Sequence, residues 1–309
     1  MLFRQLEYFV AVARERHFAR AAEACYVSQP ALSASIAKLE RELNVTLINR
    51  GHNYQGLTPE GERLVVWAKR ILAEQEAFKA EVAAVRSGIT GTLRLGTEPT
   101  ASTTLVLPVA AFCAEHPLAK VHVHSRLSTA ELCRQLQAFE LDAAIAHFAP
   151  DDRAGLQLVP LYTERYMLLA SDQLVPPTEA MTWADAAQLP LALLTSDMRI
   201  REVIDRAFAD SGVVVSPHME TDSVASLYAL VGVGRCAAIM PHTWLRAMPA
   251  ADGIRAVRLV DPDATAQVSV AIHSATPGSP TARAFVNAAT GLSLDEFYEQ
   301  PVLTAHPEH

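Results

Sequence analysis

The segment VSQPALSASIAKLEREL, residues 27–43, carries small polar side chains where the outer face of a helix usually carries long charged ones. Apolar residues recur along it at the spacing of one helix face, which predicts burial of that face: Leu32, Ile36, Leu39 and Leu43. At about 100° per residue, the opposite face points away from the core. Glutamine and serine there can pair with base edges in a DNA major groove, and small neighbours allow a close approach. The residues with this chemistry are Ser28, Gln29, Pro30, Ser33 and Ala34, flanked by Lys38 and Arg41.

Two short helices joined by a turn must position this face. FARAAEAC, residues 18–25, is predicted to be an Ala-rich helix whose small side chains allow close packing. Tyr26 and Val27 form the turn, Ser28 can cap the second helix, and Pro30 fits its first turn, where a missing N–H costs nothing. This pattern is typical of a helix-turn-helix. The alternative interpretation is that residues 28–30 only start the helix and do not contact DNA.

A polar loop between two apolar segments follows in VTLINRGHNYQGLTPEG, residues 45–61. The apolar residues 47–48 and Leu57 predict a two-stranded wing, with Arg50 and His52 near its tip. The candidates for contacts with DNA phosphates are Arg50 and, on the preceding helix, Lys38 and Arg41.

A strict heptad repeat runs along the next predicted helix, residues 59–88, which Thr58 can cap. Its apolar positions are Leu64, Ala68, Ile71, Phe78, Val82 and Val85. A stripe on a helix about 45 Å long needs a partner helix, so we expect these residues to pair two chains. Packing of the stripe on its own domain is the alternative. Ser87, Gly88 and Gly91 end the helix and predict a hinge at 89–91.

Charge is distributed unevenly along the 309 residues. The net charge is −8, but residues 1–90 carry 12 Lys and Arg against 10 Asp and Glu, whereas residues 91–309 carry 14 against 24. The mildly basic first part is compatible with a surface that contacts phosphates. No uncharged apolar run approaches a membrane span, and residues 1–20 are charged throughout, unlike a signal peptide. We therefore expect a cytoplasmic protein that has no membrane partner.

Short apolar strands alternate with helices from Thr92 onward, which predicts a parallel α/β sheet. Strands are expected at 92–97, 120–125, 142–147, 164–170, 191–195, 218–222, 236–240 and 267–273. Helices are expected at 102–116, 129–139, 182–188, 199–211, 223–232 and 281–298. The predicted α+β multidomain chain has a winged helix-turn-helix at 1–58, a linker helix at 59–88, a hinge at 89–91, an α/β domain at 92–300 and a tail at 301–309. In the α/β domain, lobe I is expected at 92–163 and 267–300, and lobe II at 164–266.

Hydroxyl groups follow several predicted strands, whose ends should face one crevice. The first strand leads into a helix start with hydroxyls and free N–H groups, a natural seat for a carboxylate or another anion. The candidate ligand contacts are Thr97, Thr100, Ser102, Ser128, Thr129 and His147, together with Thr195, Ser196 and Thr221 from the other lobe. Each hydroxyl by itself is more typical of a helix cap than of a ligand contact, and only the convergence of several strand ends favours a ligand site. Glu98 would repel an anion unless it faces away or pairs with Arg199 or Arg201.

The segment FVAVARERHFARAAEACYVSQPALSASIAKLERELNVTLINR, followed by LTPEGERL, resembles the N-terminal DNA-binding domain of LysR-type transcriptional regulators. LRLGTEPT, PLYTERYMLLAS and VGVGRCAAIMP resemble that family's effector-binding domain, so the resemblance covers essentially the whole chain. It implies a two-lobed domain like the type 2 periplasmic solute-binding proteins. It also implies homodimers that assemble into a homotetramer on an inverted-repeat operator in double-stranded DNA. The implied effector is a small molecule bound between the lobes, and the strand-end hydroxyls favour a small organic anion. Ala34 departs from the family, which often has a basic residue at this place.

Enzyme and metal motifs are absent from the sequence. GxSxG, HExxH, a phosphate loop and GxGxxG before a helix are all missing, so neither catalytic residues nor a cofactor are expected. His122 and His124 alternate along one strand face, which is more typical of surface residues than of a metal site. The cysteines lack CxxC or metal-ligand spacing: Cys25, Cys113, Cys133 and Cys236. A thiol-based redox sensor and a ligand-binding module without DNA function remain the alternatives.

Overall fold

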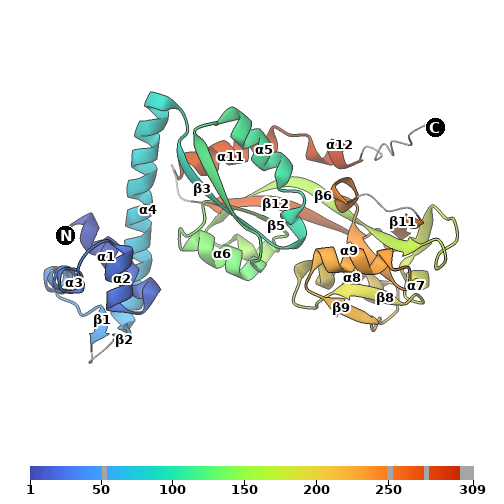
Figure 1. Cartoon of the computed structure of the whole chain (residues 1–309), viewed down its shortest axis with the longest axis horizontal. Coiled ribbons are helices and arrows are strands. Elements are labelled where there is room, and N and C mark those ends of the chain that lie inside the picture. Colours follow the sequence, from blue (N-terminus) through green and yellow to red (C-terminus); the bar gives the residue numbers. More distant parts are fainter. Residues whose placement is uncertain (51–53, 249–252, 275–277, 300–309) are drawn as a thin grey trace. The chain divides into compact units, whose positions relative to one another are not determined.

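A computed structural model describes residues 1–50, 54–248, 253–274 and 278–299, with the backbone alone described at Arg50 (Figure 1). The chain forms two compact units, one built essentially of Met1–Gly88 and the other of residues from Ile89 onward. Within the described residues, every helix is too short or too polar to cross a lipid bilayer. The predicted class, a winged helix-turn-helix and a long helix followed by a two-lobed α/β domain, is confirmed. His52 and the expected tail at 301–309 lie outside the described residues.

The N-terminal unit is a winged helix-turn-helix that continues into a long helix. Its elements are α1 Phe3–Glu15, α2 Phe18–Ala24, α3 Gln29–Leu43, β1 Ile48–Arg50, β2 Tyr54–Leu57 and α4 Pro59–Ser87. Ser28 caps α3 by accepting a hydrogen bond from the Ala31 N–H, as predicted. Three of the four apolar residues predicted on the inner face of α3 are fully buried: Leu32, Ile36 and Leu39. Leu43 is 42 % exposed because it is the last residue of the helix, so its predicted burial is wrong.

The helix α4 begins at a point where only glycine fits. The Thr58 hydroxyl accepts a hydrogen bond of 2.9 Å from the Gly61 N–H and donates one of 2.6 Å to the Thr46 carbonyl. A Cβ atom on Gly61 would lie 2.0 Å from the carbonyl oxygen of Leu47, far inside any normal contact distance. The first turn of α4 is therefore held against the residues that lead into the wing.

The heptad stripe of α4 divides into two parts. Ala68 is 2 % exposed within a single chain, and Leu64 and Ile71 pack beside it on the helix-turn-helix core, where α1 lies along α4. These three residues therefore contribute to the core of their own unit, as the alternative interpretation expects, and their predicted role in pairing chains stays a prediction. The remaining apolar positions of the stripe project from the far end of the helix and are 71 %, 46 % and 83 % exposed: Phe78, Val82 and Val85.

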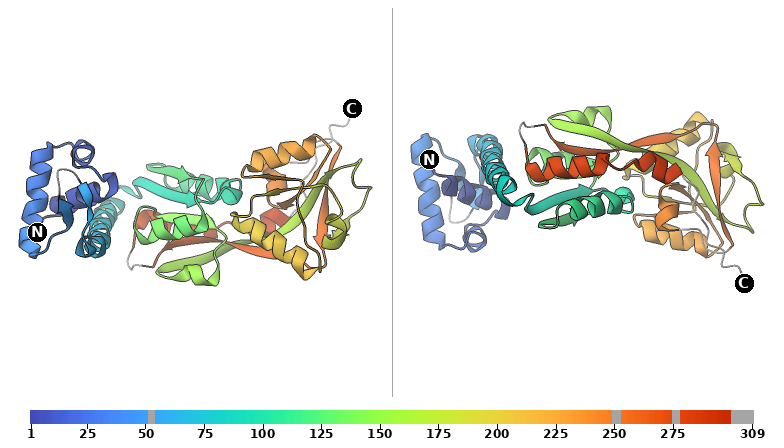
Figure 2. Two further views of the ribbon diagram at one scale, coloured as in Figure 1. Left: turned by 90° about the horizontal axis from the view of Figure 1, so that it is seen from below. Right: turned by 90° about the horizontal axis from the view of Figure 1, so that it is seen from above.

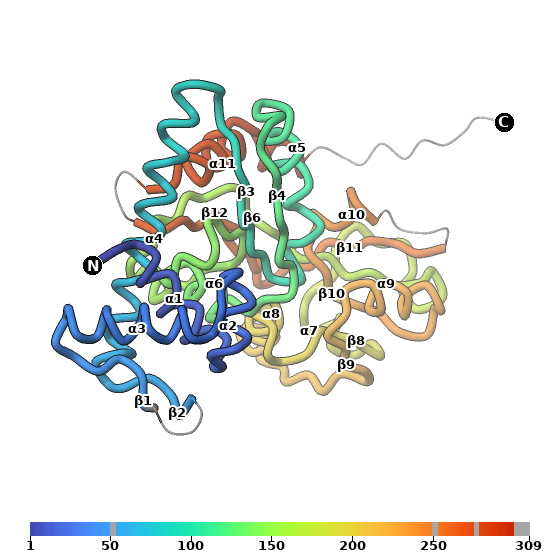
Figure 3. Tube along the Cα trace, turned by 60° about the vertical axis from the view of Figure 1, so that its left-hand side comes forward, coloured from blue at the N-terminus to red at the C-terminus, as the bar shows by residue number. Residues whose placement is uncertain are grey.

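The C-terminal unit is built around one mixed sheet. Its strands are β3 Gly91–Thr97, β4 Ala119–His124, β5 Ala143–Ala146, β6 Leu156–Ser171, β7 Ala180–Thr182, β8 Leu191–Leu194, β9 Met219–Thr221, β10 Ala237–Pro241, β11 Ile254–Val260 and β12 Thr265–His273. The order is β4-β3-β5-β12-β6-β10-β8-β9, with β11 paired on β6 and β7 on β11. Figure 3 shows β8, β9 and β10 side by side. The outer strands pair in parallel, but β12 and β6 run antiparallel to their neighbours, so the predicted all-parallel sheet is wrong at its centre.

The strand β6 serves both lobes. Its first part pairs with β12 as far as Arg165, and its second part, from Tyr166, pairs with β10 and β11. The sequence predicts a strand only at 164–170, because Pro160 interrupts the pattern of strand-forming residues. In the structure Pro160 is accommodated beside a register shift opposite Ser269. One continuous strand thus connects the two lobes.

The helices of the C-terminal unit lie on both faces of the sheet. They are η1 Thr100–Ser102, α5 Val106–Glu115, α6 Thr129–Gln137, η2 Pro150–Arg153, α7 Trp183–Ala186, α8 Arg199–Asp210, α9 Val224–Gly232, α10 Trp244–Ala247, α11 Pro280–Thr290 and α12 Leu294–Glu299. In the first lobe α5 and α11 share one face, with the rings of Phe112 and Phe285 5.9 Å apart (Figure 2). Helix α6 covers the other face through Leu132 and Leu136. The second lobe has its own core around Trp183 and Phe208.

Several elements differ from the sequence-based expectation. The helix expected at 281–298 is interrupted at Gly291 and forms α11 and α12. The helix expected at 102–116 begins instead with the short turn η1 before α5. The short elements β7 and α10 and the strand β11 were not predicted.

Candidate nucleic-acid interface and effector site

The outer face of α3 is exposed as predicted. Ser28, Gln29, Pro30 and Ala34 are exposed, and Ser33 is half-buried beside them. The buried leucines and isoleucine on the opposite side anchor the helix in the core of the N-terminal unit. A small, neutral and polar face is therefore presented by a helix that cannot rotate, which suits close approach to a groove floor.

Basic residues lie at the C-terminal part of the same face. Lys38 is exposed and its Nζ lies 4.0 Å from Glu42. Arg41 is exposed, and its Nε donates a hydrogen bond of 3.3 Å to the Ala37 carbonyl. Among the residues that the structure describes, neither cation is engaged in a buried ion pair, so both remain available for phosphates. Arg50 lies on β1, but its side chain and His52 lie outside the described part of the chain.

A residue that sequence reasoning missed ties the wing to α3. Oε1 of Glu40 accepts hydrogen bonds from the backbone N–H groups of Leu47 at 2.9 Å and Ile48 at 3.3 Å. Asn49 in turn donates to the Leu57 carbonyl at 3.0 Å across the wing. The wing base is thus fixed relative to the α3 face. A half-buried glutamate late in α3 carries no sequence signal for this contact, because its partners are backbone groups.

The predicted effector residues of the first lobe fall into different environments. Thr97 is buried and donates to the Ile145 carbonyl at 2.8 Å, so its hydroxyl is used within the sheet. Ser102 donates to the Pro99 carbonyl at 2.6 Å, and the exposed Ser128 accepts from the Glu131 N–H at 3.3 Å. These three behave as structural hydrogen-bonding groups, and their predicted role in ligand binding stays a prediction.

Thr100, Thr129 and His147 belong to one connected cluster. Thr129 donates to Oε2 of Glu98 at 3.4 Å, and the backbone N–H of His147 donates to Oε1 of the same carboxylate at 3.1 Å. The backbone carbonyl of Thr100 accepts from the Trp244 indole at 2.9 Å. The Thr100 hydroxyl is buried and has no hydrogen-bond partner among the described residues.

The second-lobe candidates are grouped with one another and not with this cluster. The backbone N–H of Thr195 donates to the Thr221 carbonyl at 3.1 Å, which joins the ends of β8 and β9. The Thr221 hydroxyl accepts from the Ser223 N–H at 3.1 Å, and Ser196 is exposed. The hydroxyl of Thr195 is buried without a partner among the described residues.

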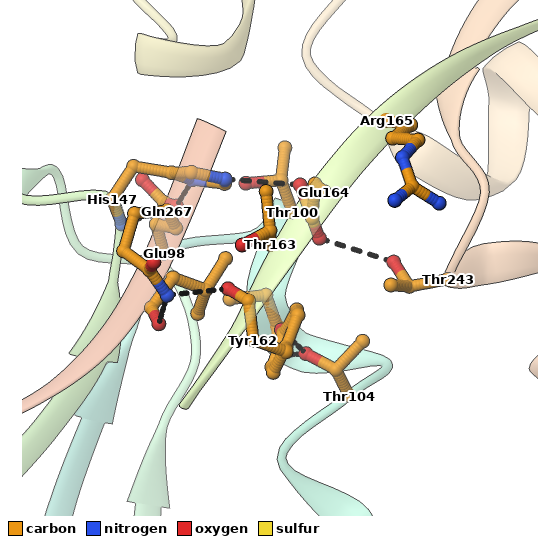
Figure 4. A network of polar contacts seen from close by, with 12 residues as sticks. Glu98, Thr100, Thr104, His147, Tyr162, Thr163, Glu164, Arg165, Thr243 and Gln267 are labelled. Atoms are coloured by element: carbon orange, nitrogen blue, oxygen red, sulfur yellow. Dashed lines mark hydrogen bonds and ion pairs between the residues drawn. The ribbon is translucent and has the colours of Figure 1, made fainter. Parts of the chain in front are cut away.

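The centre of the first cluster is a buried histidine between two carboxylates. Nδ1 of His147, at the end of β5, contacts Oε1 of Glu98, and Nε2 lies 2.9 Å from Oε2 of Glu164 on β6 (Figure 4). The chain of contacts continues into the second lobe, because the Thr243 hydroxyl donates to Oε1 of Glu164 at 3.0 Å. Beside it, Thr104 is hydrogen-bonded to the Tyr162 hydroxyl. Sequence reasoning identified His147 but missed Glu164 and Thr243.

The surroundings shift the pKa values of this cluster. Burial alone would lower the pKa of His147, but the charges of Glu98 and Glu164 raise it to about 10. Burial, reinforced by the charge of Glu164, raises the pKa of Tyr166 well above its usual value.

Glu98 pairs with neither of the two arginines that the sequence suggested as its partners, because both arginines pair with other carboxylates. Arg199 pairs with Glu202, and Arg201 pairs with Asp205 and Glu220.

Models of two known protein families match this chain. A model described as the bacterial regulatory helix-turn-helix protein, lysR family, matches residues 3–62, and one described as the LysR substrate binding domain matches residues 86–292. The chain belongs to the LysR family of transcriptional regulators. This assignment confirms the resemblance seen in the sequence, and it makes the chain a DNA-binding regulator.

Similar LysR-family proteins are named as regulators of transcription. The hydrogen peroxide-inducible genes activator of Haemophilus influenzae is 28 % identical over 95 % of this chain and 96 % of its own length. The Escherichia coli K12 proteins named DNA-binding transcriptional dual regulator OxyR and nitrogen assimilation regulatory protein nac are each 29 % identical, over 91 % and 92 % of both chains, respectively.

Solved LysR-family structures share the fold. A full-length OxyR variant from Pseudomonas aeruginosa is 24 % identical, covers 94 % of this chain and 98 % of its own, and has a TM-score of 0.73. Full-length CbnR complexed with its target DNA is also 24 % identical, covers 94 % and 99 %, and has a TM-score of 0.64.

Proposed function

We propose that this LysR-family chain binds an inverted-repeat operator through α3 and the wing of two paired chains, and that a small molecule at the junction of the two lobes modulates this binding. The observation that supports the DNA-binding part most directly is the outer face of α3. Its exposed small and polar residues lie opposite Leu32, Ile36 and Leu39, which are fully buried. A helix fixed in this way presents one face only.

The residues of this face make different kinds of contact with DNA. Gln29 can pair with the N6 and N7 atoms of adenine, and Ser33 can pair with base edges of either kind. Ala34 brings a methyl group suited to contact with thymine instead of the basic side chain frequent in the family. Because α3 has few long side chains that can contact base edges, DNA shape and the wing contribute more to specificity than they would beside a helix with such side chains. Lys38, Arg41 and Arg50 bind phosphates.

Pairing of two chains follows from the end of α4. Phe78, Val82 and Val85 form an apolar stripe that the chain itself leaves largely exposed. A second copy of the same helix would bury this stripe and place two helix-turn-helix motifs at a fixed distance. Two such dimers, joined through their α/β domains, form the homotetramer that the family resemblance implies.

For three of the four cysteines, ligand binding accounts for regulation better than thiol oxidation does. A thiol that senses peroxide needs a lowered pKa, since the thiolate is the reactive form. Burial raises the pKa of Cys133 to about 11, and it also raises the pKa values of Cys25 and Cys236. The buried polar cluster around His147 offers instead a connection between the lobes that a small molecule can alter.

A gel-shift comparison tests the DNA-binding proposal. Full-length wild type, Gln29→Ala and Ser33→Ala are titrated against DNA flanking the gene and against unrelated DNA of equal length. We expect both variants to bind the flanking DNA about tenfold more weakly while binding to the unrelated DNA barely changes. Gln173→Ala, which alters an exposed glutamine of the second lobe, is the matched control. Equal losses on both DNAs would show that Gln29 and Ser33 only support the fold.

A further inference from the structure

The cluster at the junction of the lobes carries a fixed net charge. Both ring nitrogens of His147 are hydrogen-bonded to carboxylates, and two such bonds require two bridging protons. With both protons on the imidazole, the cluster holds one positive and two negative charges. Moving either proton onto Glu98 or Glu164 neutralises one positive and one negative charge together. The net charge is therefore −1 for every placement of the two protons.

The nearest cations along the chain are engaged elsewhere. Arg165, next to Glu164 in sequence, pairs with Glu299 at 2.9 Å. The guanidinium of Arg246 lies 4.3 Å from the centre of the Phe297 ring. A buried charge of −1 is costly unless a cation or several donors approach it.

Two buried hydroxyls lie beside the cluster and are not used by it. Thr100 and Tyr166 are 2 % and 1 % exposed, and neither hydroxyl makes a hydrogen bond within the described residues. Thr100 belongs to the cluster because its carbonyl binds Trp244, whose neighbour Thr243 binds Glu164. Tyr166 lies close enough to Glu164 for that carboxylate to raise its pKa. Buried polar groups in native proteins are normally satisfied, so these hydroxyls are available to a bound molecule.

Glu98 is the carboxylate of the cluster that has one weakly bonded oxygen. Its Oε1 atom is occupied by His147, but within the described part of the chain Oε2 accepts only a long hydrogen bond of 3.4 Å from Thr129. Thr129 is half-buried at the start of α6, and its neighbour Ser128 is exposed. Oε2 is thus a carboxylate oxygen of the cluster with hydrogen-bonding capacity left, and it faces the half-buried Thr129.

We propose that the effector of this regulator is a small organic cation whose ammonium group binds Glu98 Oε2 and the hydroxyls of Thr100 and Tyr166. This inference rests on the proposed function and replaces the organic anion that the strand-end hydroxyls alone favoured. An ammonium group brings one positive charge and three donors. It would neutralise the cluster and supply a donor to each of these oxygens. A carboxylate ligand would add a second uncompensated negative charge.

Thermal unfolding of the full-length protein tests this assignment. The probes are methylammonium and 1,4-diaminobutane, compared with acetate and succinate, each at up to about 10 mM with ionic strength held constant. We expect the amines to raise the melting temperature of the C-terminal unit, by roughly 5 °C once the concentration is about 100 times Kd, and the carboxylates to leave it unchanged. Calorimetric titration then gives Kd for the better amine.

Charge-neutral variants locate the site. Glu98→Gln keeps the size of the side chain and should weaken amine binding at least tenfold. Glu131→Gln, which removes a carboxylate on the outside of α6, is the matched control and should bind as wild type does. If Glu98→Gln does not fold, as judged by circular dichroism, Thr129→Val tests the same oxygen and should change amine affinity without loss of fold.

The outcomes separate this inference from the proposed function. Stabilisation by acetate or succinate alone, no response to either amine, or an amine response that survives Glu98→Gln would each overturn the cationic effector. Binding of the flanking DNA by the same preparation is measured in parallel by gel shift. Loss of that binding would count against the proposed function, whereas intact DNA binding without an amine response counts against the effector class alone.

Discussion

The Thr243 hydroxyl donates a hydrogen bond of 3.0 Å to Oε1 of Glu164, and both side chains are buried where the two lobes meet. Thr243→Val keeps the shape of the side chain but leaves this carboxylate oxygen without its donor. We expect the free energy of unfolding to fall by about 2 kcal/mol, the usual cost of an unsatisfied buried group near a charge. Urea denaturation measures the loss. Thr178→Val, at an exposed threonine, should change stability by less than about 0.5 kcal/mol, and equal losses in the two variants would contradict the buried contact.

The pKa of His147 predicts a pH dependence of stability. The folded-state value is raised from 6.5 to about 10 by the two glutamates, against the effect of burial. The stabilisation from its proton is complete below the unfolded value and is lost as the pH rises toward 10. We expect the free energy of unfolding to fall across this window with a slope of up to about 1.4 kcal/mol per pH unit.

Urea titrations at a series of pH values measure this slope. His147→Gln, which cannot titrate, should be less stable at neutral pH and should show a flatter profile between neutral pH and 10. The same slope in the variant and the wild type would show that His147 is not the group responsible.

Gly61 offers a test of the junction between α4 and the wing. Gly61→Ala places a methyl group 2.0 Å from the Leu47 carbonyl oxygen, so backbone must move. We expect a loss of about 3 kcal/mol in the N-terminal unit and weaker binding to any DNA, because the wing base shifts. Gly232→Ala, where a Cβ would meet nothing within 4 Å, should leave stability unchanged or slightly raised. Calorimetric melting of both variants decides; a Gly61→Ala protein as stable as wild type would refute the close contact.

The sequence predicted the N-terminal unit well because its signals are local. Ser28 and Thr58 cap their helices as expected, and the inner face of α3 follows from helical spacing. The separation of the heptad stripe into a packed half and an exposed half was not predictable. It depends on α1 lying along α4, a contact between residues far apart in sequence.

The effector region was predicted less completely, for a similar reason. His147 was found because it ends a strand, but its partners Glu98 and Glu164 come from the end of β3 and from β6, at separations of 49 and 17 residues. No spacing rule brings such residues together. Pro160 also interrupts the sequence pattern of β6, so the sequence predicts only its second part. Glu164 therefore has the pattern of an ordinary strand residue, although it connects the two lobes.

The exposed end of α4 predicts how the chain associates. Phe78→Glu places a charge in the middle of the apolar stripe that we propose pairs two chains. We expect light scattering after size exclusion to show a smaller assembly, and operator binding to weaken at least tenfold because two linked motifs become one. Val214→Glu, at an exposed apolar residue of the second lobe, should leave the mass unchanged. An unchanged mass for Phe78→Glu would place the pairing surface elsewhere.

Nuclease footprinting of the full-length protein on the DNA flanking its gene tests most directly whether two α3 helices bind one symmetric operator. We expect protection of an inverted repeat whose half-site centres lie about one helical turn, or a multiple of it, apart. We also expect Gln29→Ala to abolish this protection at a protein concentration that saturates the wild-type footprint. A protected region without two-fold symmetry, or one that Gln29→Ala leaves intact, would contradict this binding mode.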